Sequence, residues 1–537
     1  MSKNRLFYTI KLTSSLLKEY KYNLSNLITI RNDSEVAKPL TFRDCLHAGL
    51  VVSLSDSQML KSIRDITGQK VDYELLEKWY LERDRLKKSK NNTEAKRTKV
   101  RELQDQIYKM MYIPEYITVF MESVSDYEHI FKKGFIFCGR KYVRFSCSAS
   151  QARVSTVVFV CEDIKDELKR RLDNGRDEGH PLAPSKYNAY FGLYSSASVK
   201  VTKPRYCIVS DFSSVKDVTL DYAIETDWDI DDILEERTLP IEFNRFDGSG
   251  LISPKMAEQW AKDLGEDYVP CQFCIRYSFT KGLLNEFDFV EWCRDELEGI
   301  KPEEEKYIIT DIYGKKQDLR EIDVILTEGM AKLWDSWISQ EEYEKNCEIN
   351  GIDMRVTKYA PKKDKEASTV NYQYIQTIDL DDDDIKELCQ ETIDYIQGVT
   401  YDNKDYALLF MLGDSMDEED ISQFMERSDN YWLKSLILED NLFNDKYTKE
   451  KIKELIVKKI ELACLGRIYV QGNYQAIVPD SFALMQVITG QKVTGLLNDG
   501  EFYSKFWEER GVDKFACERS PLTWRAETLV VENKYKV

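Results

Sequence analysis

The spacing of apolar residues changes along the chain, and each change predicts a change of element type. Residues 73–113 carry apolar positions at helical spacing among charged ones, with a break at Ser-Lys-Asn-Asn, which predicts a helical hairpin. Residues 115–225 are rich in β-branched and aromatic residues with Ser and Gly breaks, as is typical of strands. Residues 240–335 are again strand-like, with helices expected at 254–264 and 286–298.

The second half of the chain shows the same change of spacing. Residues 336–460 are expected to be helical on the strength of four segments, ISQEEYEKNCEING, DDDDIKELCQETIDYIQ, MDEEDISQFMER and TKEKIKELIVKKIELAC. Residues 466–494 return to a composition that predicts strands. We therefore expect a mixed and helical-hairpin region over 1–114, a β-rich region over 115–340, a helical connector over 341–460 and a second β-rich region over 461–537.

Length and composition support a chain of several packed units. With 537 residues it is too long for one compact core, and 42% apolar residues are enough to fill more than one. No apolar run reaches the roughly 18 residues that a membrane helix needs. The first residues, MSKNRLFYTIKL, lack the continuous apolar segment of a secretory signal. We expect a cytoplasmic protein without a membrane partner, in a bacterial host if the gene is phage-encoded.

Charge and cysteine content narrow the candidate chemistry. A net charge of −19 disfavours a protein that binds nucleic acid over its whole surface, although a basic cleft can persist within an acidic shell. The one CxxC pair, Cys271 and Cys274, has no second pair at zinc spacing, and the chain has only three histidines. We expect reduced cysteines buried in strands and no metal site among them.

Residues 272–284, QFCIRYSFTKGLL, place Arg276 and Lys281 in an otherwise apolar and aromatic segment. A buried cation needs a partner, either a carboxylate of the protein or an anionic ligand. The segment alone leaves both partners open.

Three further segments carry residues of interest. Asp247 and Gly248 open a tight Asp-Gly-Ser-Gly turn, Lys332 follows the apolar strand-like VILT, and Arg519 and Arg525 flank a proline in RSPLTWR. Each cation alone is typical of a surface or ion-pair residue, but together they favour a phosphate-bearing ligand. The chain has neither a GxxxxGK[ST] loop nor a GxGxxG loop, so we do not expect an ATPase of those fold types.

These segments resemble a known family in order and spacing. FDGSGLIS, QFCIRYSFTKG and VILTEGMAKLW are similar to motifs of the cell-encoded RNA-dependent RNA polymerases of RNA silencing and of the related single-chain bacteriophage RNA polymerases. FSCSASQAR (145–153) resembles the family's SxSQxR stretch, and GRIYVQGNYQAIVPD and RSPLTWRAE resemble the start of its second barrel. The resemblance covers roughly residues 115–537.

The resemblance implies an α+β fold with a first double-psi β-barrel, helical N-terminal and connector regions, and an incomplete second double-psi β-barrel. It also implies template-directed nucleotidyl transfer, in which the RNA 3′-OH attacks the NTP α-phosphate and pyrophosphate leaves. Lys281 and Lys332 match the two lysines that face the nucleotide and the RNA 3′ end, and Arg276 matches the basic residue beside them. Asp247 and Gly248 match a turn near the nucleotide that we expect to be structural.

In the second barrel, Arg519 matches the arginine that reads the incoming ribose, with Arg525 in a supporting position. The family holds its Mg²⁺ ions on a DxDGD loop, which would follow RSPLTWRAE but does not occur in these residues. DLDDDD (379–384) is expected to be a solvated helix start, and the turn NDGEF (498–502) does not replace the loop either.

The leading interpretation is the N-terminal part of an RNA polymerase that is inactive alone. A C-terminal polypeptide would bring the DxDGD loop and Mg²⁺, and the further partners would be NTPs, nascent RNA and a DNA or RNA template. The alternative is a non-catalytic nucleic-acid-binding or assembly protein derived from such a polymerase. A third interpretation, an acidic globular protein with coincidental motifs, predicts that Lys281 and Lys332 lie far apart.

Overall fold

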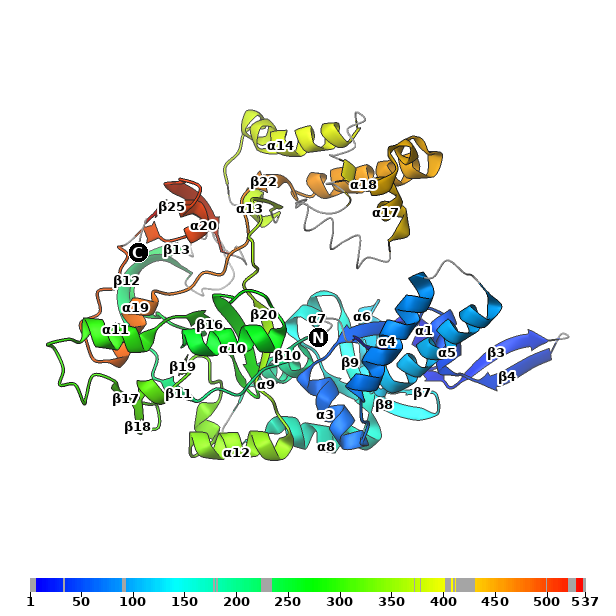
Figure 1. Ribbon diagram of the computed structural model, residues 1–537, viewed down its shortest axis with the longest axis horizontal. Helices are drawn as coiled ribbons and strands as arrows, with labels where there is room; N and C mark the ends of the chain where they lie inside the picture. Colours follow the sequence, from blue (N-terminus) through cyan, green and yellow to red (C-terminus); the bar gives the residue numbers. More distant parts are fainter. Residues whose placement is uncertain are drawn as a thin grey trace. The chain divides into compact units, whose positions relative to one another are not determined.

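The chain is described by a computed structural model in which two compact units can be distinguished (Figure 1). The first unit is Met1–Ala360 with Ala483–Val493, and the second is Pro361–Phe482 with Thr494–Val537. The structure describes residues 6–31, 34–88, 93–176, 179, 182–223, 234–370, 372–376, 378–400, 407–408, 411, 430–498, 500–519 and 528–534.

The first unit contains a seven-stranded mixed sheet at its N-terminal end. Its spatial order is β2-β7-β8-β9-β6-β1-β5. The strands are β1 (Leu6–Thr13), β2 (Asn23–Leu24), β5 (Val51–Ser55), β6 (Tyr112–Phe120), β7 (Phe135–Phe137), β8 (Arg140–Ser146) and β9 (Thr156–Cys161). β1 and β6 pair in parallel, whereas β9 pairs antiparallel with both β6 and β8. The central β6 is buried along most of its length, as expected for a strand covered on both faces.

A second seven-stranded sheet of the same unit carries the candidate site. Its order is β10-β20-β15-β16-β14-β19-β11. The strands are β10 (Val199–Lys200), β11 (Tyr206–Val209), β14 (Ser249–Ile252), β15 (Gln272–Tyr277), β16 (Thr280–Glu286), β19 (Val324–Thr327) and β20 (Arg355–Tyr359). β14 pairs in parallel with β16 and antiparallel with β19, so segments far apart in sequence meet at the middle of the sheet.

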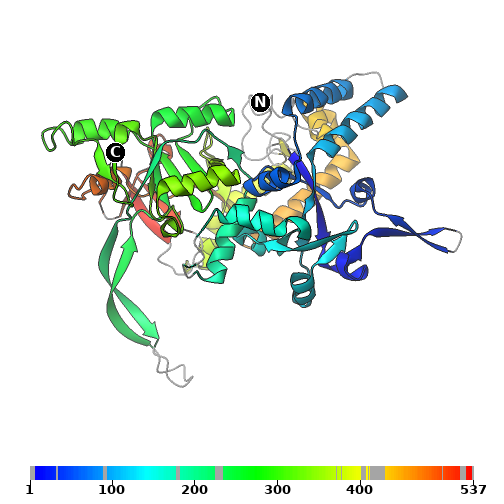
Figure 2. The ribbon, with the colours of Figure 1, turned by 90° about the horizontal axis from the view of Figure 1, so that it is seen from below.

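Helices and short hairpins complete the first unit. The helices are α1 (Ser14–Glu19), α2 (Phe42–His47), α3 (Gln58–Thr67), α4 (Tyr73–Lys88), α5 (Glu94–Met111), α6 (Val124–Lys133), α7 (Ala149–Arg153), α8 (Glu162–Asp173), α9 (Pro184–Phe191), α10 (Pro254–Leu264), α11 (Phe289–Glu296) and α12 (Gln340–Asn350), together with the part of α19 (Ser481–Ile488) that begins at Ala483. The two-stranded pairs are β3 (Asn26–Arg31) with β4 (Ser34–Pro39), β12 (Ser213–Ala223) with β13 (Leu234–Asn244), and β17 (Ile308–Thr310) with β18 (Lys316–Asp318). The β12–β13 ribbon projects from the rest of its unit (Figure 2).

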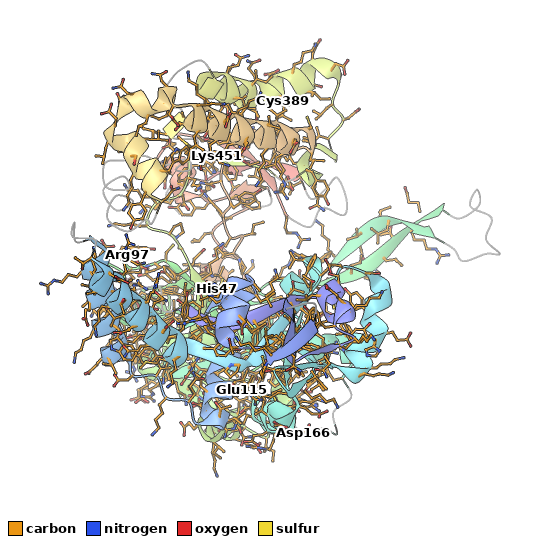
Figure 3. All side chains as sticks on the ribbon, turned by 90° about the vertical axis from the view of Figure 1, so that its right-hand side faces the viewer. His47, Arg97, Glu115, Asp166, Cys389 and Lys451 are labelled. Atoms are coloured by element: carbon orange, nitrogen blue, oxygen red, sulfur yellow. The ribbon has the colours of Figure 1, made fainter. Side chains whose placement is uncertain are left out.

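One continuous apolar cluster runs through both large sheets of the first unit. Its largest fully buried side chains include Trp260 on α10, Tyr142 on β8 and Phe273 on β15. Each such side chain contributes roughly 1.5–3 kcal/mol by leaving water, so this core fixes the strands on which the cations lie. The charged exterior is also evident: Arg97 lies on the exposed side of α5 (Figure 3).

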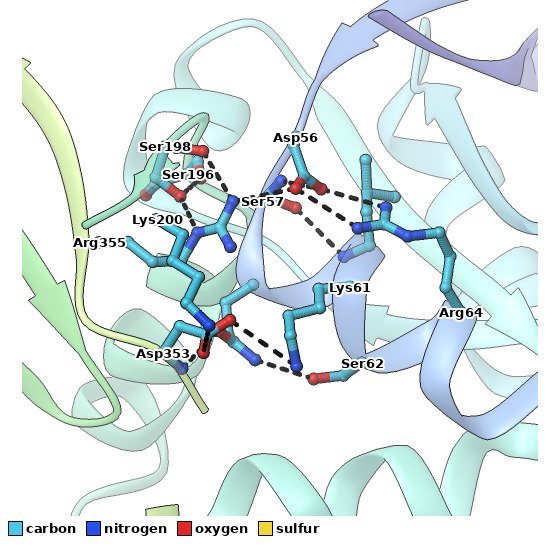
Figure 4. Close-up of polar contacts among 12 residues, drawn as sticks. Asp56, Ser57, Lys61, Ser62, Arg64, Ser196, Ser198, Lys200, Asp353 and Arg355 are labelled. Carbon is cyan, nitrogen blue, oxygen red and sulfur yellow. Dashed lines mark hydrogen bonds and ion pairs between the residues drawn. The ribbon is translucent and has the colours of Figure 1, made fainter. Parts of the chain in front are cut away.

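An ionic network joins the two sheets of the first unit (Figure 4). Arg355 on β20 is buried and donates to Asp56 Oδ2 at 3.1 Å, to Ser198 O at 2.7 Å and to Ser198 Oγ at 2.9 Å. Asp56, which follows β5, also accepts from Arg64 on α3 at 3.1 Å and 3.3 Å. Nearby, Lys200 pairs with Asp353 at 2.9 Å. These contacts tie β20 to the N-terminal sheet.

The second unit is mainly helical. Its elements are α13 (Gln373–Gln376), α14 (Asp382–Thr400), α17 (Tyr431–Leu438), α18 (Lys446–Cys464), α20 (Lys505–Glu508), β21 (Ala367–Thr369), β22 (Tyr469–Gln471), β23 (Glu501–Phe502), β24 (Lys514–Glu518) and β25 (Thr528–Asn533). β23, β25 and β24 form a three-stranded sheet, and β21 pairs with β22. Within the described part of the chain, no helix is both long and apolar enough to cross a membrane.

Many of the predicted elements are present. Helices α4 and α5 occupy the predicted hairpin, and α10 and α11 lie within the ranges predicted for them. α10 starts at Pro254, and the Ser253 side chain accepts from Met256 N, as expected of an N-cap. The predicted helix MDEEDISQFMER lies outside the described residues.

Three predictions of element type were wrong in part. Residues 466–494 were predicted as strands, but only β22 forms, and Ser481–Ile488 is helix α19, because Ala, Leu, Met and Gln favour helix and a short apolar run fits either state. The helical interval 336–460 is interrupted by β20, whose pairing with β15 supplies the partner that a strand needs. The strand-rich interval 115–225 also contains helices, of which α8 begins with two acidic residues.

Candidate functional site

Arg276 and Lys281 face each other across the β15–β16 hairpin. The two strands pair antiparallel with Arg276 opposite Lys281, so both side chains lie on the same face of the sheet. Both residues are half-buried. Like charges directly opposite each other destabilise a hairpin, and burial increases that cost. The placement of these two cations opposite each other is therefore not explained by the stability of the hairpin.

Neither cation has an ion pair with a carboxylate within the part of the chain that the structure describes. Arg276 Nη1 donates to Ile275 O at 2.7 Å, and Arg276 Nε is buried without a partner among the described residues. Burial is the largest influence on the pKa of Arg276 and lowers it, whereas the electrostatic interaction with Cys274 acts in the opposite sense. The guanidinium is thus held in a partly desolvated place with spare donor capacity.

Lys281 belongs to a wider group of charges. Burial lowers the pKa of Lys281, the positive charges of Lys332 and Arg276 lower it further, and Asp247 acts in the opposite sense. The ammonium also lies 5.7 Å from the centre of the Tyr190 ring on α9, within range of a cation–π contact. Three cations and one acid therefore share one electrostatic environment.

Lys332 reaches this group on the loop after β19. Thr327 Oγ1 at the end of β19 donates to Ser249 O at 2.9 Å, and Lys281 N donates to Met330 O at 3.0 Å. Lys332 Nζ lies 3.4 Å from Asp247 Oδ1, and the Lys332 side chain is 22% exposed. The loop is therefore fastened to both β14 and β16, which brings Lys332 beside Lys281. The third interpretation, an acidic globular protein with coincidental motifs, predicted that these two lysines lie far apart. That prediction is wrong.

Two glycines make the close packing of these segments possible. Gly248 has φ +72°, and its carbonyl accepts from Leu283 N at 2.9 Å. A Cβ on Gly282 would lie 2.6 Å from Gly248 O and 2.5 Å from Met330 Cε. Because only glycine leaves that space open, the Asp-Gly turn can lie directly on β16 next to Lys281.

Asp211 is a residue of the site that the sequence did not single out. It follows β11, and its carboxylate accepts from Gly329 N at 3.1 Å and from Asn244 Nδ2 at 2.5 Å. It thereby holds the loop that carries Lys332 and ties it to the end of β13. Its position two residues after the buried strand YCIV is the one available signal, since polar residues at strand ends often face a site.

The SxSQxR stretch also approaches this site. Ser148 caps α7, and its side chain and that of Gln151 form a reciprocal capping box. A Cβ on Gly192 would lie 2.8 Å from Ser148 Cα, so the backbone after α9 passes directly over this cap. Since α9 carries Tyr190, the stretch supports the wall of the site that faces Lys281.

The remaining predicted site residues belong to the second unit. Arg519 directly follows β24, and Arg525 lies outside the described residues. The structure gives no relation between Arg519 and the first-unit lysines, because the two units are described separately.

No metal centre is found within the described residues, where no group of three or more His, Cys, Asp or Glu side chains could hold an ion. Asp247 is the one carboxylate among the charges that act on Lys281. The DLDDDD segment is a helix start, as predicted: Asp381 Oδ1 accepts from the backbone of Asp383 and Asp384 at 2.9 Å each. The described residues therefore do not fit a two-metal site.

A cavity of about 830 Å³ in the first unit lies elsewhere, beside the β17–β18 hairpin. Its lining contains neither Lys281 nor Lys332, and basic residues such as Lys315 alternate with acidic ones such as Glu304. Balanced charges of this kind do not select an anion, so this cavity is not the candidate site.

The chain is similar in sequence to known RNA polymerases. A family model described as RNA dependent RNA polymerase matches residues 84–522. The chain is 25% identical over 410 residues to the DNA-directed RNA polymerase YonO of Bacillus phage SPbeta, covering 74% of this chain and 44% of that protein. It is 28% identical over 176 residues to RNA-dependent RNA polymerase 6 of Arabidopsis thaliana, covering 30% of this chain and 12% of that protein.

Among solved structures, the RNA-dependent RNA polymerase QDE-1 from Thielavia terrestris is similar with a TM-score of 0.40 and 12% sequence identity. The match covers 79% of this chain and 45% of that one. The chain thus spans less than half the length of each of these three relatives.

Proposed function

Because the chain belongs to the RNA dependent RNA polymerase family, we propose that its first unit supplies the cationic, nucleotide-facing part of an RNA polymerase site. The proposed reaction is attack of an RNA 3′-OH on the α-phosphate of an NTP, with release of pyrophosphate. In this proposal the second large sheet belongs to a first double-psi β-barrel, and residues 461–537 form the start of a second one.

The proposal gives each cation a task. Lys281 and Lys332 balance the negative charge of the triphosphate and the RNA 3′ end, and Arg276 adds donors beside them. Arg519 would contact the ribose, with Arg525 in support. Asp247 and Gly248 shape the turn that brings these segments together. The observation that carries the proposal is the placement of three cations on one patch, where Asp247 is the one acid that acts on Lys281 and no ion pair to Lys281 or Arg276 is found among the described residues.

The metal ions must come with residues other than those described. A DxDGD loop, which residues 1–537 do not contain, would hold Mg²⁺ and supply the Lewis-acid chemistry of nucleotidyl transfer. We propose that a separate polypeptide, acting as the C-terminal part of the enzyme, brings this loop. Both DNA and RNA remain candidate templates, since the related proteins are named for one or the other.

Nucleotide binding tests the lysine assignment without any need for catalysis. We expect the 537-residue chain to bind ATP and tripolyphosphate in isothermal titration calorimetry. Lys281→Ala and Lys332→Ala should each weaken binding by about tenfold, as is typical of losing a charge-assisted contact. Lys262→Ala, which removes an exposed lysine at the end of α10, is the matched control and should change nothing. Unchanged affinity in both site variants would refute the assignment.

Activity tests the split-enzyme proposal. The chain is mixed with a polypeptide that carries a DxDGD loop, Mg²⁺, NTPs and single-stranded DNA or RNA. Incorporation that needs both polypeptides and Lys281 supports a polymerase. Nucleic-acid binding without incorporation favours the second candidate, a non-catalytic binding protein.

A further inference from the structure

The β12–β13 ribbon has two chemically different faces. Residues that pair directly across an antiparallel ladder share a face, and neighbours along a strand alternate. One face carries the pairs Ser214–Phe243, Lys216–Ile241, Val218–Leu239 and Leu220–Arg237. The other carries Val215–Glu242, Asp217–Pro240 and Thr219–Thr238, and the two threonine hydroxyls of the last pair lie 3.0 Å apart.

Charge is segregated between these faces. Over the part of the ribbon whose side chains are described, the first face contains lysine and arginine but no acid, whereas the second contains aspartate and glutamate but no cation. Arg245, one residue beyond β13, joins the first face: its Nε donates to Ser214 Oγ at 2.5 Å and its guanidinium lies 5.8 Å from the Phe243 ring. We call the first face the cationic face.

The cationic face is also apolar and open. Its five apolar side chains form one contiguous strip along the ribbon. Two of them, Leu220 and Phe243, are 39% and 38% exposed to solvent. The ribbon projects from its own unit in two views (Figures 2 and 3). A two-stranded ribbon is marginally stable in water by itself, so an apolar strip on one side of it suits a bound partner.

The base of the ribbon leads into the candidate site. Asn244, the last residue of β13, donates to Asp211, which in turn holds Gly329 in the Lys332 loop. Asp247 follows two residues after Arg245. The strip of cations and apolar groups therefore starts where the lysines are.

We propose that the cationic face of the β12–β13 ribbon binds a single-stranded stretch of nucleic acid on its way to or from the lysine site. Lys216 and Arg245 contact phosphates, and Phe243 offers its ring to a base. The acidic far face repels the same polyanion and so fixes which side is used. This inference rests on the proposed function, because it extends the path of the strand that the lysines would hold.

A protein partner is the less favoured occupant. An apolar face for protein docking does not need an excess of one charge sign, and aromatic stacking flanked by Lys and Arg is the pattern that single-stranded nucleic acid uses. Seven residues of β-strand, such as 214–220, extend about 23 Å, which is long enough to follow several nucleotides.

The test measures binding of fluorescein-labelled, unstructured RNA and DNA 20-mers to the full 537-residue chain by fluorescence anisotropy over a series of salt concentrations. The double variant Lys216→Gln/Arg245→Gln should raise Kd about tenfold or more and reduce the slope of log K against log salt by about 1.4, since each single-strand phosphate contact contributes about 0.7. Phe243→Ala should raise Kd about tenfold through lost stacking, and Phe243→Leu should do nearly the same.

The opposite face supplies matched controls. Asp217→Asn/Glu242→Gln changes two charges and Val215→Ala shortens a side chain that is 68% exposed, and neither should raise Kd. Unfolding midpoints within a degree or two of the parent show that the ribbon is intact. The proposal is overturned if variants of the cationic face and variants of the opposite face bind the nucleic acids with equal Kd. It is also overturned if the parent chain does not bind them.

Two readouts separate this proposal from its alternatives. ATP affinity should be unchanged in all ribbon variants. The ribbon proposal and the assignment of Lys281 to nucleotide binding can therefore be refuted independently of each other. Sedimentation velocity follows self-association: if Phe243→Ala shifts the oligomeric state but leaves nucleic-acid Kd unchanged, the face is an interface between copies of the chain and the proposal is wrong.

Discussion

Arg355 and Arg276 lie directly opposite each other on β20 and β15, yet their surroundings differ. Arg355 is 2% exposed and has a carboxylate, a hydroxyl and a carbonyl as partners. Arg276 and its neighbour Lys281 are half-buried and have no carboxylate paired with them among the described residues. A buried cation with a structural role is paired with a carboxylate of the protein. A partly buried cation without such a partner is a candidate for binding an anionic ligand.

The largest expected effect comes from removing the counter-ion of Arg355. Asp56→Ala leaves Arg355 buried without a carboxylate and also frees Arg64, so the free energy of unfolding should fall by about 3–5 kcal/mol. Equilibrium unfolding in urea measures it. Asp217→Ala, on the exposed ribbon, serves as the control and should change stability by less than about 0.5 kcal/mol. A small effect at Asp56 would remove the distinction between the two arginines.

Next in size is the effect of closing the space between β16 and the Asp-Gly turn. Gly282→Ala should cost about 1–3 kcal/mol and weaken ATP binding, because the new methyl group collides with Gly248 O and Met330 and displaces Lys281. Gly472→Ala is the control, since its nearest contact would be 4.0 Å away. Thermal unfolding and calorimetry with ATP report the two effects. Normal stability together with normal binding would contradict the packing described for the site.

A smaller effect is expected from removing the charge of Lys281. Because burial and nearby cations lower its pKa in the folded chain, the unfolded chain holds this proton more tightly, and stability should rise as pH climbs from the folded pKa toward 10.5. Lys281→Met should remove that rise and leave neutral-pH stability equal or higher, by about 0–1 kcal/mol. Parallel urea titrations of both proteins between about pH 8 and about pH 10.5 test this. Marked destabilisation by Lys281→Met would identify a structural lysine.

The smallest expected effect concerns Asp247. Its carboxylate is 64% exposed and lies 3.4 Å from Lys332, so Asp247→Asn should change stability by only about 0–1 kcal/mol. Tripolyphosphate should then bind about two- to threefold more tightly, since the acid that opposes the lysines is gone. Weaker binding in calorimetry would show that Asp247 holds Lys332 in its productive position.

The sequence predicted the local features of the site well. Ser253 before Pro254 marked a helix start, the apolar VILT marked a strand, and the apolar setting of Arg276 and Lys281 marked cations that need partners. These features depend on a few neighbouring residues, so they can be read without the fold.

Features set by distant contacts could not be predicted. Asp211 acts through the backbone of Gly329, more than a hundred residues away, and no local pattern marks that contact. The partner of Arg355 is Asp56, which belongs to the other sheet. The helix at Ser481–Ile488 was missed because its short, mostly apolar run has only Ser481 and Gln486 as polar positions, too few to read a period.

The assignment of Ala483–Val493 to the first unit has a practical consequence for dissecting the protein. Ala483, Leu484 and Met485 are buried, so a fragment that stops at Ala360 would lose apolar side chains that belong to its own interior. Expression of the lysine-bearing unit by itself should therefore include residues 483–493, joined to Ala360 by an artificial linker. Insolubility of a fragment without them would reflect the missing apolar residues and would not show that the unit cannot fold.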